Sequence, residues 1–213
     1  MIFLFGESVK RQSEALGNQD CPVCQRATPF SHILETNYFC LFGLRLLPLE
    51  KISDYHSCDN CGNAFQAPNA NGVLVPSQLH SVQRVLAYLL VGYSMQDQIA
   101  LACDIFNKVT GSELRAADLR DNVNSISLGH TDLFGELNQQ TPHLNVRGKQ
   151  QIIEAAFLVT HSFCEIQYED RLRINLIASS IGMSIPFVSA TIDQVRQQGC
   201  YGVRRVLPAQ TQA

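Results

Sequence analysis

The sequence lacks an apolar run long enough to cross a bilayer as a helix, which needs about 20 residues. The opening MIFLFGESVK has five apolar residues at its start, no basic residue ahead of them and Glu7 soon after, so we expect neither a signal peptide nor a membrane span. The chain also lacks a basic field, because 16 Lys and Arg stand against 19 Asp and Glu and the net charge is -3. Binding to nucleic acid is therefore not expected.

Catalytic motifs are absent as well. The sequence contains no Gly-rich phosphate loop, no H-E-x-x-H and no G-x-S-x-G, each of which would bring a defined chemistry. His161 and Glu165 are spaced i, i+4, but a single such pair near a predicted helix end indicates a solvated or capping role. The sequence therefore predicts a protein that is not an enzyme.

Cysteine, in contrast, is plentiful. The chain has eight cysteines, and without a secretory signal we expect a reducing, cytoplasmic location, where cysteines are metal ligands or small buried apolar residues. Four of them form two C-x2-C pairs separated by 33 residues: Cys21, Cys24, Cys58 and Cys61. Two such turns can place four sulfurs in a tetrahedron around Zn²⁺, and four protein ligands leave no open position, so the predicted site is structural.

Other readings of these cysteines remain open at this point. Iron in a rubredoxin-like site uses the same four sulfurs, whereas a redox pair would require a βαβ pattern that the sequence does not show. His32 and His56 are alternative ligands, but four cysteines already complete the set. Gly62 directly follows the second pair and is expected to adopt a left-handed conformation in the knuckle turn.

Strand-like segments fill the 33-residue spacer. FSHILETNY at 30–38 and FCLFGLRLL at 39–47 are predicted to pair antiparallel, and KISDYHS at 51–57 to return to the second knuckle. Together with the knuckles they predict a zinc ribbon. The apolar run at 39–49 is interpreted as strand core, with a contact surface as the alternative.

After APNANGVLVP at 67–76 the apolar residues recur at helical spacing. Seven helices are predicted: from Ser77 to Tyr93, from a Ser94–Asp97 capping box to Gly111, over 114–126, over 133–137, from about Val146 to Phe163, from about Leu172 to Gly182, and from Ser184 to Gly199. The predicted fold class is α+β with segregated domains: a small antiparallel zinc ribbon followed by an all-α bundle. The domains are 1–67 for the ribbon, 68–76 for a linker, 77–200 for the helices and 201–213 for a flexible tail.

Two resemblances go with these motifs. MIFLFG, Gly17, CPVC, LLPLEK and CDNCGNAF, within residues 1–67, together resemble a family of small bacterial zinc-ribbon domains that begin with such a strand. The rhythm of AAFLVTHSFCEIQYEDRLRINLIASSIGMS, within 77–198, resembles the TerB-like domain of tellurite-resistance proteins and DnaJ-like co-chaperones. That resemblance implies a weak second metal site at Asp97, Glu165 and Asp170, although this chain has Phe163-Cys164 where the family has Asp-Gly. The alternative is that Asp97 and Asp170 are helix N-terminal acids.

These observations predict a non-enzymatic, zinc-binding interaction or adaptor protein. The resemblance implies a stress-response or membrane-associated complex, with an unknown protein as partner and peripheral membrane association left open. The alternatives are a rubredoxin-like iron electron carrier and a nucleic-acid-binding zinc ribbon.

Overall fold

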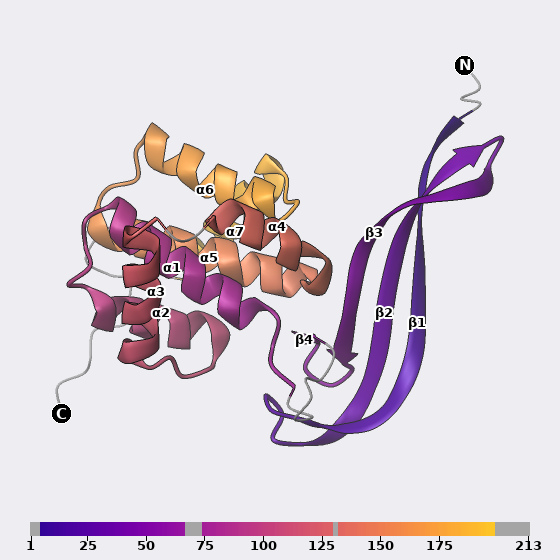
Figure 1. The fold of residues 1–213 in the computed structure, drawn as a ribbon, viewed down its shortest axis with the longest axis horizontal. Helices are drawn as coiled ribbons and strands as arrows, with labels where there is room; N and C mark the ends of the chain where they lie inside the picture. Colours follow the sequence, from indigo (N-terminus) through magenta and orange to yellow (C-terminus); the bar gives the residue numbers. More distant parts are fainter. Residues whose placement is uncertain (1–4, 67–73, 130–131, 199–213) are drawn as a thin grey trace. The chain divides into compact units, whose positions relative to one another are not determined.

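The computed structural model describes residues 5–66, 74–129 and 132–198. The chain divides into two compact units, and the predicted α+β layout is confirmed: an antiparallel sheet is followed by seven helices in the described residues (Figure 1). Unit 1 holds the residues up to Ser77 together with Gln140–Gly148, and unit 2 holds Gln78–Gln139 and the residues from Lys149 onward. Most of the predicted linker and the whole predicted tail lie outside the described residues.

The sheet of unit 1 has four strands in the order β1-β2-β3-β4, all antiparallel. Three are long and one is short: β1 Phe5–Cys21, β2 Arg26–Leu41, β3 Leu44–Cys58 and β4 Ala64–Phe65. The length of β1 was not predicted, because its sequence is mostly polar and exposed and carries no apolar alternation. Pairing with β2 along its whole length is what holds it in the sheet.

The predicted pairing of 30–38 with 39–47 is wrong. Leu41 pairs with Leu44, and the chain reverses at Phe42 and Gly43, whose φ angles are 53° and 79°. Positive φ at both central residues is the geometry of the two-residue hairpin that matches strand twist. The apolar run at 39–49 therefore contains a turn and supplies parts of two strands.

The core of unit 1 lies at the knuckle end of the sheet. One cluster joins Phe30 and Phe65 to Cys21, Cys58 and Leu74, and a smaller one contains Ile33, Tyr55 and Ala64. The rings of Phe30 and Phe65 lie 5.4 Å apart. No residue from 38 to 52 is buried, so the strand-core interpretation of 39–49 is wrong and the outer half of the sheet has no core of its own.

Unit 2 contains the helices. Their bounds are α1 Gln78–Gly92, α2 Ile99–Thr110, α3 Ala116–Ser127, α4 Leu133–Gln140, α5 Val146–Phe163, α6 Tyr168–Ser180 and α7 Ile185–Gln197; the last residue of α4 and the first three of α5 are assigned to unit 1. Fully buried apolar residues of α1 and α5, such as Leu86, Leu89, Ile152 and Phe157, form the core of the bundle. Within the described residues no single helix is both long and apolar enough to cross a bilayer, although α6 and α7, with a 116° bend between them, meet the length and composition criteria as a pair.

Two helix starts differ from the prediction. The capping box at Ser94 and Asp97 is wrong, because α2 begins at Ile99 and Ser94 has a φ of 55° that belongs to a turn. A capping box occurs at α6 instead, where the Asp170 carboxylate accepts a hydrogen bond from the backbone N–H of Gln167 at 2.9 Å. The predicted closure of α2 is confirmed, since Gly111 is left-handed with a φ of 70°.

Candidate metal centre

The two C-x2-C turns have matching backbone geometry. Cys21 ends β1 and Cys58 ends β3, and in each turn the N–H of the residue after the second cysteine donates to the carbonyl of the first. Both of these bonds, from Gln25 and from Gly62, are 2.8 Å long. Both donors have left-handed φ angles, 53° for Gln25 and 68° for Gly62. The predicted left-handed conformation of Gly62 is confirmed. Gln25 adopts the same conformation, which is strained for a residue with a Cβ atom.

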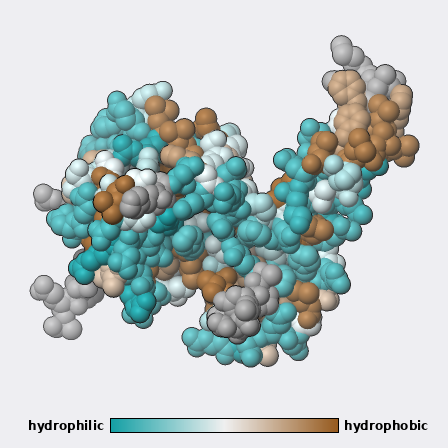
Figure 2. All heavy atoms as spheres, viewed as in Figure 1, coloured by the Kyte–Doolittle hydropathy of each residue, from teal (hydrophilic) through white to brown (hydrophobic). Residues whose placement is uncertain are grey.

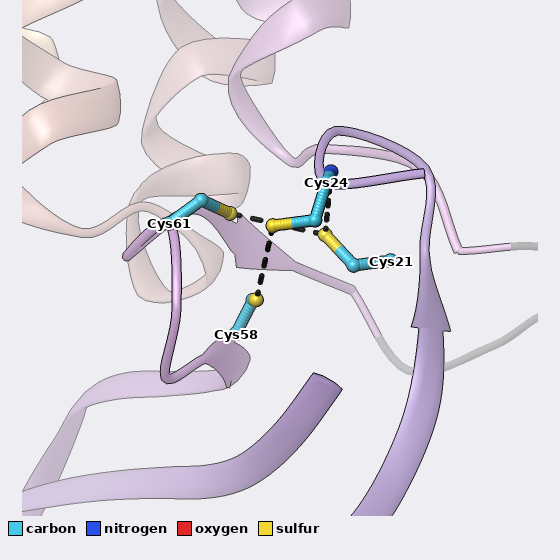
Figure 3. A group of neighbouring side chains, drawn as sticks. All are labelled: Cys21, Cys24, Cys58 and Cys61. Carbon is cyan, nitrogen blue, oxygen red and sulfur yellow. Dashed lines mark hydrogen bonds between the residues drawn. The ribbon is translucent and has the colours of Figure 1, made fainter. Parts of the chain in front are cut away.

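The four sulfurs converge on one point (Figure 3). Cys21 Sγ lies 3.8 Å from Cys61 Sγ, Cys24 Sγ lies 3.9 Å from Cys58 Sγ, and all four ligand atoms are within 4.8 Å of one another. A tetrahedral Zn²⁺ with bonds of about 2.3 Å places its sulfurs about 3.8 Å apart. The cysteines are therefore close enough to hold a metal ion, and the spacing of their sulfurs fits a tetrahedral one.

Polar groups surround the sulfurs. Each sulfur has at least one such group within hydrogen-bonding distance, and these groups favour the thiolate form that a metal requires. The contacts are Thr28 Oγ1 to Cys58 at 3.2 Å, Asn60 Nδ2 to Cys24 at 3.2 Å, Asn63 Nδ2 to Cys61 at 3.3 Å and the backbone N of Cys24 to Cys21 at 3.4 Å. The roles of these three side chains were not predicted from the sequence, although Asn60 and Asn63 lie in and directly after the second knuckle.

The thiols differ in how easily they ionise. Burial raises the pKa of Cys21 to about 12 and also raises the pKa of Cys61. Burial opposes ionisation of Cys58 too, but the Thr28 hydroxyl and the backbone N–H groups of Cys61 and Asn60 outweigh it and lower the Cys58 pKa to about 6. Four thiolates packed this closely repel one another, so full deprotonation needs a cation among them.

A distant segment of the chain completes the surroundings of the second knuckle. Arg147 Nη1 donates to the carbonyl of Cys61 at 2.9 Å, and Asn145 Nδ2 donates to the carbonyl of Gly62 at 2.7 Å. His143 Nδ1 lies 2.8 Å from the carbonyl of Asp54 in β3. The prediction assigned this segment to the helical domain, and no local pattern in the sequence links it to the cysteines.

Neither histidine considered as a ligand joins the sulfurs. His32 Nε2 lies 2.7 Å from Asp54 Oδ1, and the ring of His56 lies 5.4 Å from that of His32. Burial, together with the proximity of His32, lowers the pKa of His56. In the part of the chain that the structure describes, the four cysteines are the one group of His, Cys, Asp and Glu with converging ligand atoms.

The three acidic residues of the second candidate site are not brought together. Asp170, at the start of α6, accepts hydrogen bonds from Tyr93 Oη at 2.5 Å and from Gln167, which use its oxygens within the fold. Asp97 is exposed and accepts from Gln98 Nε2, and Glu165 is exposed as well. The geometry of Asp170 is that of a helix-capping acid.

His161 and Glu165, the i, i+4 pair of the sequence, have different surroundings: Glu165 is exposed, whereas His161 packs inside unit 2. His161 stacks on Phe157 with ring centroids 5.3 Å apart, and neither of its ring nitrogens has a hydrogen-bond partner. Burial lowers the pKa of His161. Its main contact is thus with the apolar interior of unit 2.

Comparisons with known proteins add no relative. No protein-family model, curated protein or solved structure matches the chain.

Proposed function

We propose that the protein is a non-enzymatic interaction module whose first unit is a zinc ribbon. The observation that carries the proposal is the closed set of four cysteine sulfurs with edges of 3.8 and 3.9 Å. Such a set leaves no coordination position for a substrate or a water, so the metal stabilises a fold and performs no reaction.

Zinc is the metal proposed for this site. Thiolate sulfur suits Zn²⁺, and the hydrogen-bond donors around the cysteines are those of a closed structural site. Free thiols at all four positions fit a reducing compartment such as the cytoplasm.

For unit 2 we propose a TerB-like role in a stress-response or membrane-associated complex. Its support is the seven-helix order and the acidic cap at Asp170, which follow the rhythm of the resemblance. In this proposal Asp170 stabilises the start of α6, and the acidic residues bind no cation.

Metal analysis of the purified full-length protein tests the proposal. We expect one zinc per chain, released on acidification and lost in Cys58→Ser. Cys40→Ser is the matched control, because Cys40 lies in β2 of the same sheet but outside the sulfur cluster. Stoichiometric iron with a visible charge-transfer band would establish the rubredoxin-like alternative instead.

A further inference from the structure

The outer end of the sheet carries a concentration of exposed apolar side chains. We call them the apolar tip: Phe5, Val9, Phe42, Leu44, Leu46, Leu47 and Leu49, each between 49% and 69% exposed. Figure 2 shows apolar side chains gathered over the β2–β3 hairpin, at the opposite end of the sheet from β4. Exposed apolar groups that are contiguous in this way mark a binding surface.

Strand pairing places part of the apolar tip on one face of the sheet. Phe5 pairs with Leu41, which pairs with Leu44, and Glu7 pairs with Phe39, which pairs with Leu47. Paired residues share a face and every second residue along a strand returns to it. Four members of the apolar tip (Phe5, Val9, Leu44 and Leu47) therefore point to the same side.

The remaining members lie outside this regular face. Leu46 and Leu49 are extra residues at two irregularities of the β2–β3 register, and Phe42 stands at the apex, beyond the last pair. A flat protein partner stacked on the one face would not cover the apex. A fluid apolar medium, as at the surface of a lipid bilayer, can accommodate the face and the apex together.

The residue at the hairpin apex, Phe42, is itself evidence for a binding role. Phe42 is 69% exposed and has a φ of 53°, a conformation that is strained for a bulky residue and that Asn or Gly adopts readily in this turn. A strained, exposed aromatic at a hairpin tip lowers the stability of the sheet, and such an outlier points to a binding role.

The charge around the apolar tip is close to balanced. Residues 5–11 and 36–51 contain four basic residues (Lys10, Arg11, Arg45 and Lys51) and two acidic ones (Glu7 and Glu50), but Arg11 and Lys51 form ion pairs with Glu35 and Asp54 just beyond these ranges. Long basic side chains such as Lys10 and Arg45 can contact the phosphate groups that every phospholipid headgroup carries, so an excess of anionic lipid is not required.

From these observations we infer that the apex end of the apolar tip inserts into the interfacial region of a phospholipid surface. The inference deepens the proposed function, on which it rests, by naming lipid as a partner of unit 1. Insertion must be shallow, because β1 and the outer part of β3 are sheet edges whose unpaired backbone groups cannot enter hydrocarbon. A depth of about 5–10 Å corresponds to about two or three residues of each strand, which brings in Phe42 and Leu44 and leaves Arg45 able to reach the headgroups.

Vesicle binding by the full-length, metal-loaded protein tests this. Wild-type protein should sediment with vesicles of phosphatidylcholine alone, and adding phosphatidylglycerol should change binding only slightly. Phe42→Asn should weaken binding by at least about tenfold, because it removes one inserted aromatic side chain. The same change fits the turn better than Phe does, so a loss of binding cannot be ascribed to unfolding.

Leu128→Asn is the matched control. Leu128 is 68% exposed, like Phe42, but lies at the C-terminal cap of α3 in unit 2, and its replacement should leave binding unchanged. The chain contains no tryptophan, so Phe42→Trp supplies a single fluorophore. Its emission should shift to the blue and be quenched by brominated lipid, whereas that of Leu128→Trp should not.

The outcomes separate this inference from the proposed function. Zinc-loaded wild type that ignores both vesicles, or Phe42→Asn that binds as wild type does, overturns the lipid inference and leaves the zinc proposal standing. A dimer in solution that Phe42→Asn dissociates, without vesicle binding, overturns it in favour of a second copy of the chain. Protein that lacks zinc but binds vesicles through Phe42 overturns only the zinc proposal.

Discussion

Removal of the metal should unfold unit 1 and leave the helices of unit 2 folded. The perturbation is Cys58→Ser, which deletes a ligand whose side chain is completely buried, or chelation of the wild-type protein. Apart from two cysteines of the sulfur cluster and Ala64, the two clusters of unit 1 contain only five buried apolar side chains: Phe30, Ile33, Tyr55, Phe65 and Leu74.

The magnitude follows from that small core. Burial of so few side chains is too little to offset the entropy lost when three strands of fifteen to seventeen residues become ordered. A structural zinc site supplies about 10–16 kcal/mol of binding free energy, which is folding free energy where the unfolded chain holds no preformed site. We expect unit 1 to lose at least about 4 kcal/mol, a factor of about a thousand in its opening equilibrium.

Hydrogen exchange followed by mass spectrometry measures this directly. Amides of β2 and β3 near the knuckles, around Phe30 and Tyr55, should exchange about a thousandfold faster without metal. Amides in the middle of α5, around Ile153, should change only a few-fold, because their burial lies within unit 2. Cys40→Ser serves as the control and should exchange like wild type.

Slow hydrogen exchange of the strand amides in Cys58→Ser would refute this prediction. If the strands near Phe30 exchange as slowly in Cys58→Ser as in the metal-loaded protein, the sheet is stable without its metal. The argument from the small core would then be wrong.

Three further changes have defined outcomes. Replacing Arg147 by Ala removes the hydrogen bond to the carbonyl of Cys61 and should weaken the second knuckle by about 1 kcal/mol, seen as several-fold faster transfer of zinc to a chromogenic chelator; unchanged transfer would show that the contact contributes nothing. Replacing Gln25, whose φ is 53°, by Gly should stabilise metal-loaded unit 1 by about 0.5–1 kcal/mol, and a lower midpoint in urea would contradict this. Burial raises the pKa of Asp170, but hydrogen bonds from Tyr93 Oη and from neighbouring groups outweigh it and hold the pKa below 3.8. A depressed carboxyl pKa stabilises the fold above the unfolded value and loses this effect as the pH falls through the folded value. Asp170→Asn should therefore lower the stability of unit 2 at pH 7, and the difference from wild type should shrink below about pH 4; a difference independent of pH would show that the carboxylate charge is irrelevant.

Local patterns made the sulfur cluster and most helices predictable. A C-x2-C turn is complete within a few residues, so its spacing already fixes how two sulfurs point. The helix α5 was predicted from Val146 to Phe163 and has these bounds, because its apolar residues recur at helical spacing over eighteen positions. The closure of α2 depended on one glycine in the left-handed conformation.

The features that depend on pairing across the chain were not predictable. The hairpin apex carries Phe42 where a turn of this geometry favours Asn or Gly, so the apolar run hid the reversal. In the same way β1 is polar along most of its length and is a strand only because β2 lies beside it. The contact from Arg147 to the second knuckle joins residues 86 positions apart, and no spacing rule extends that far.

The distribution of buried residues along the sheet links the metal site to the apolar tip. Strands of fifteen to seventeen residues extend about 50 Å if straight, yet the buried apolar residues that the described part of the three long strands contributes lie in the half that holds the cysteines. Polar side chains at positions 44 and 47 and Asn at position 42 would satisfy an exposed hairpin better. The apolar side chains at those positions contribute no core burial. Their exposure is therefore offset only when another phase or molecule covers them, and the end that holds the cysteines is the packed base of the hairpin.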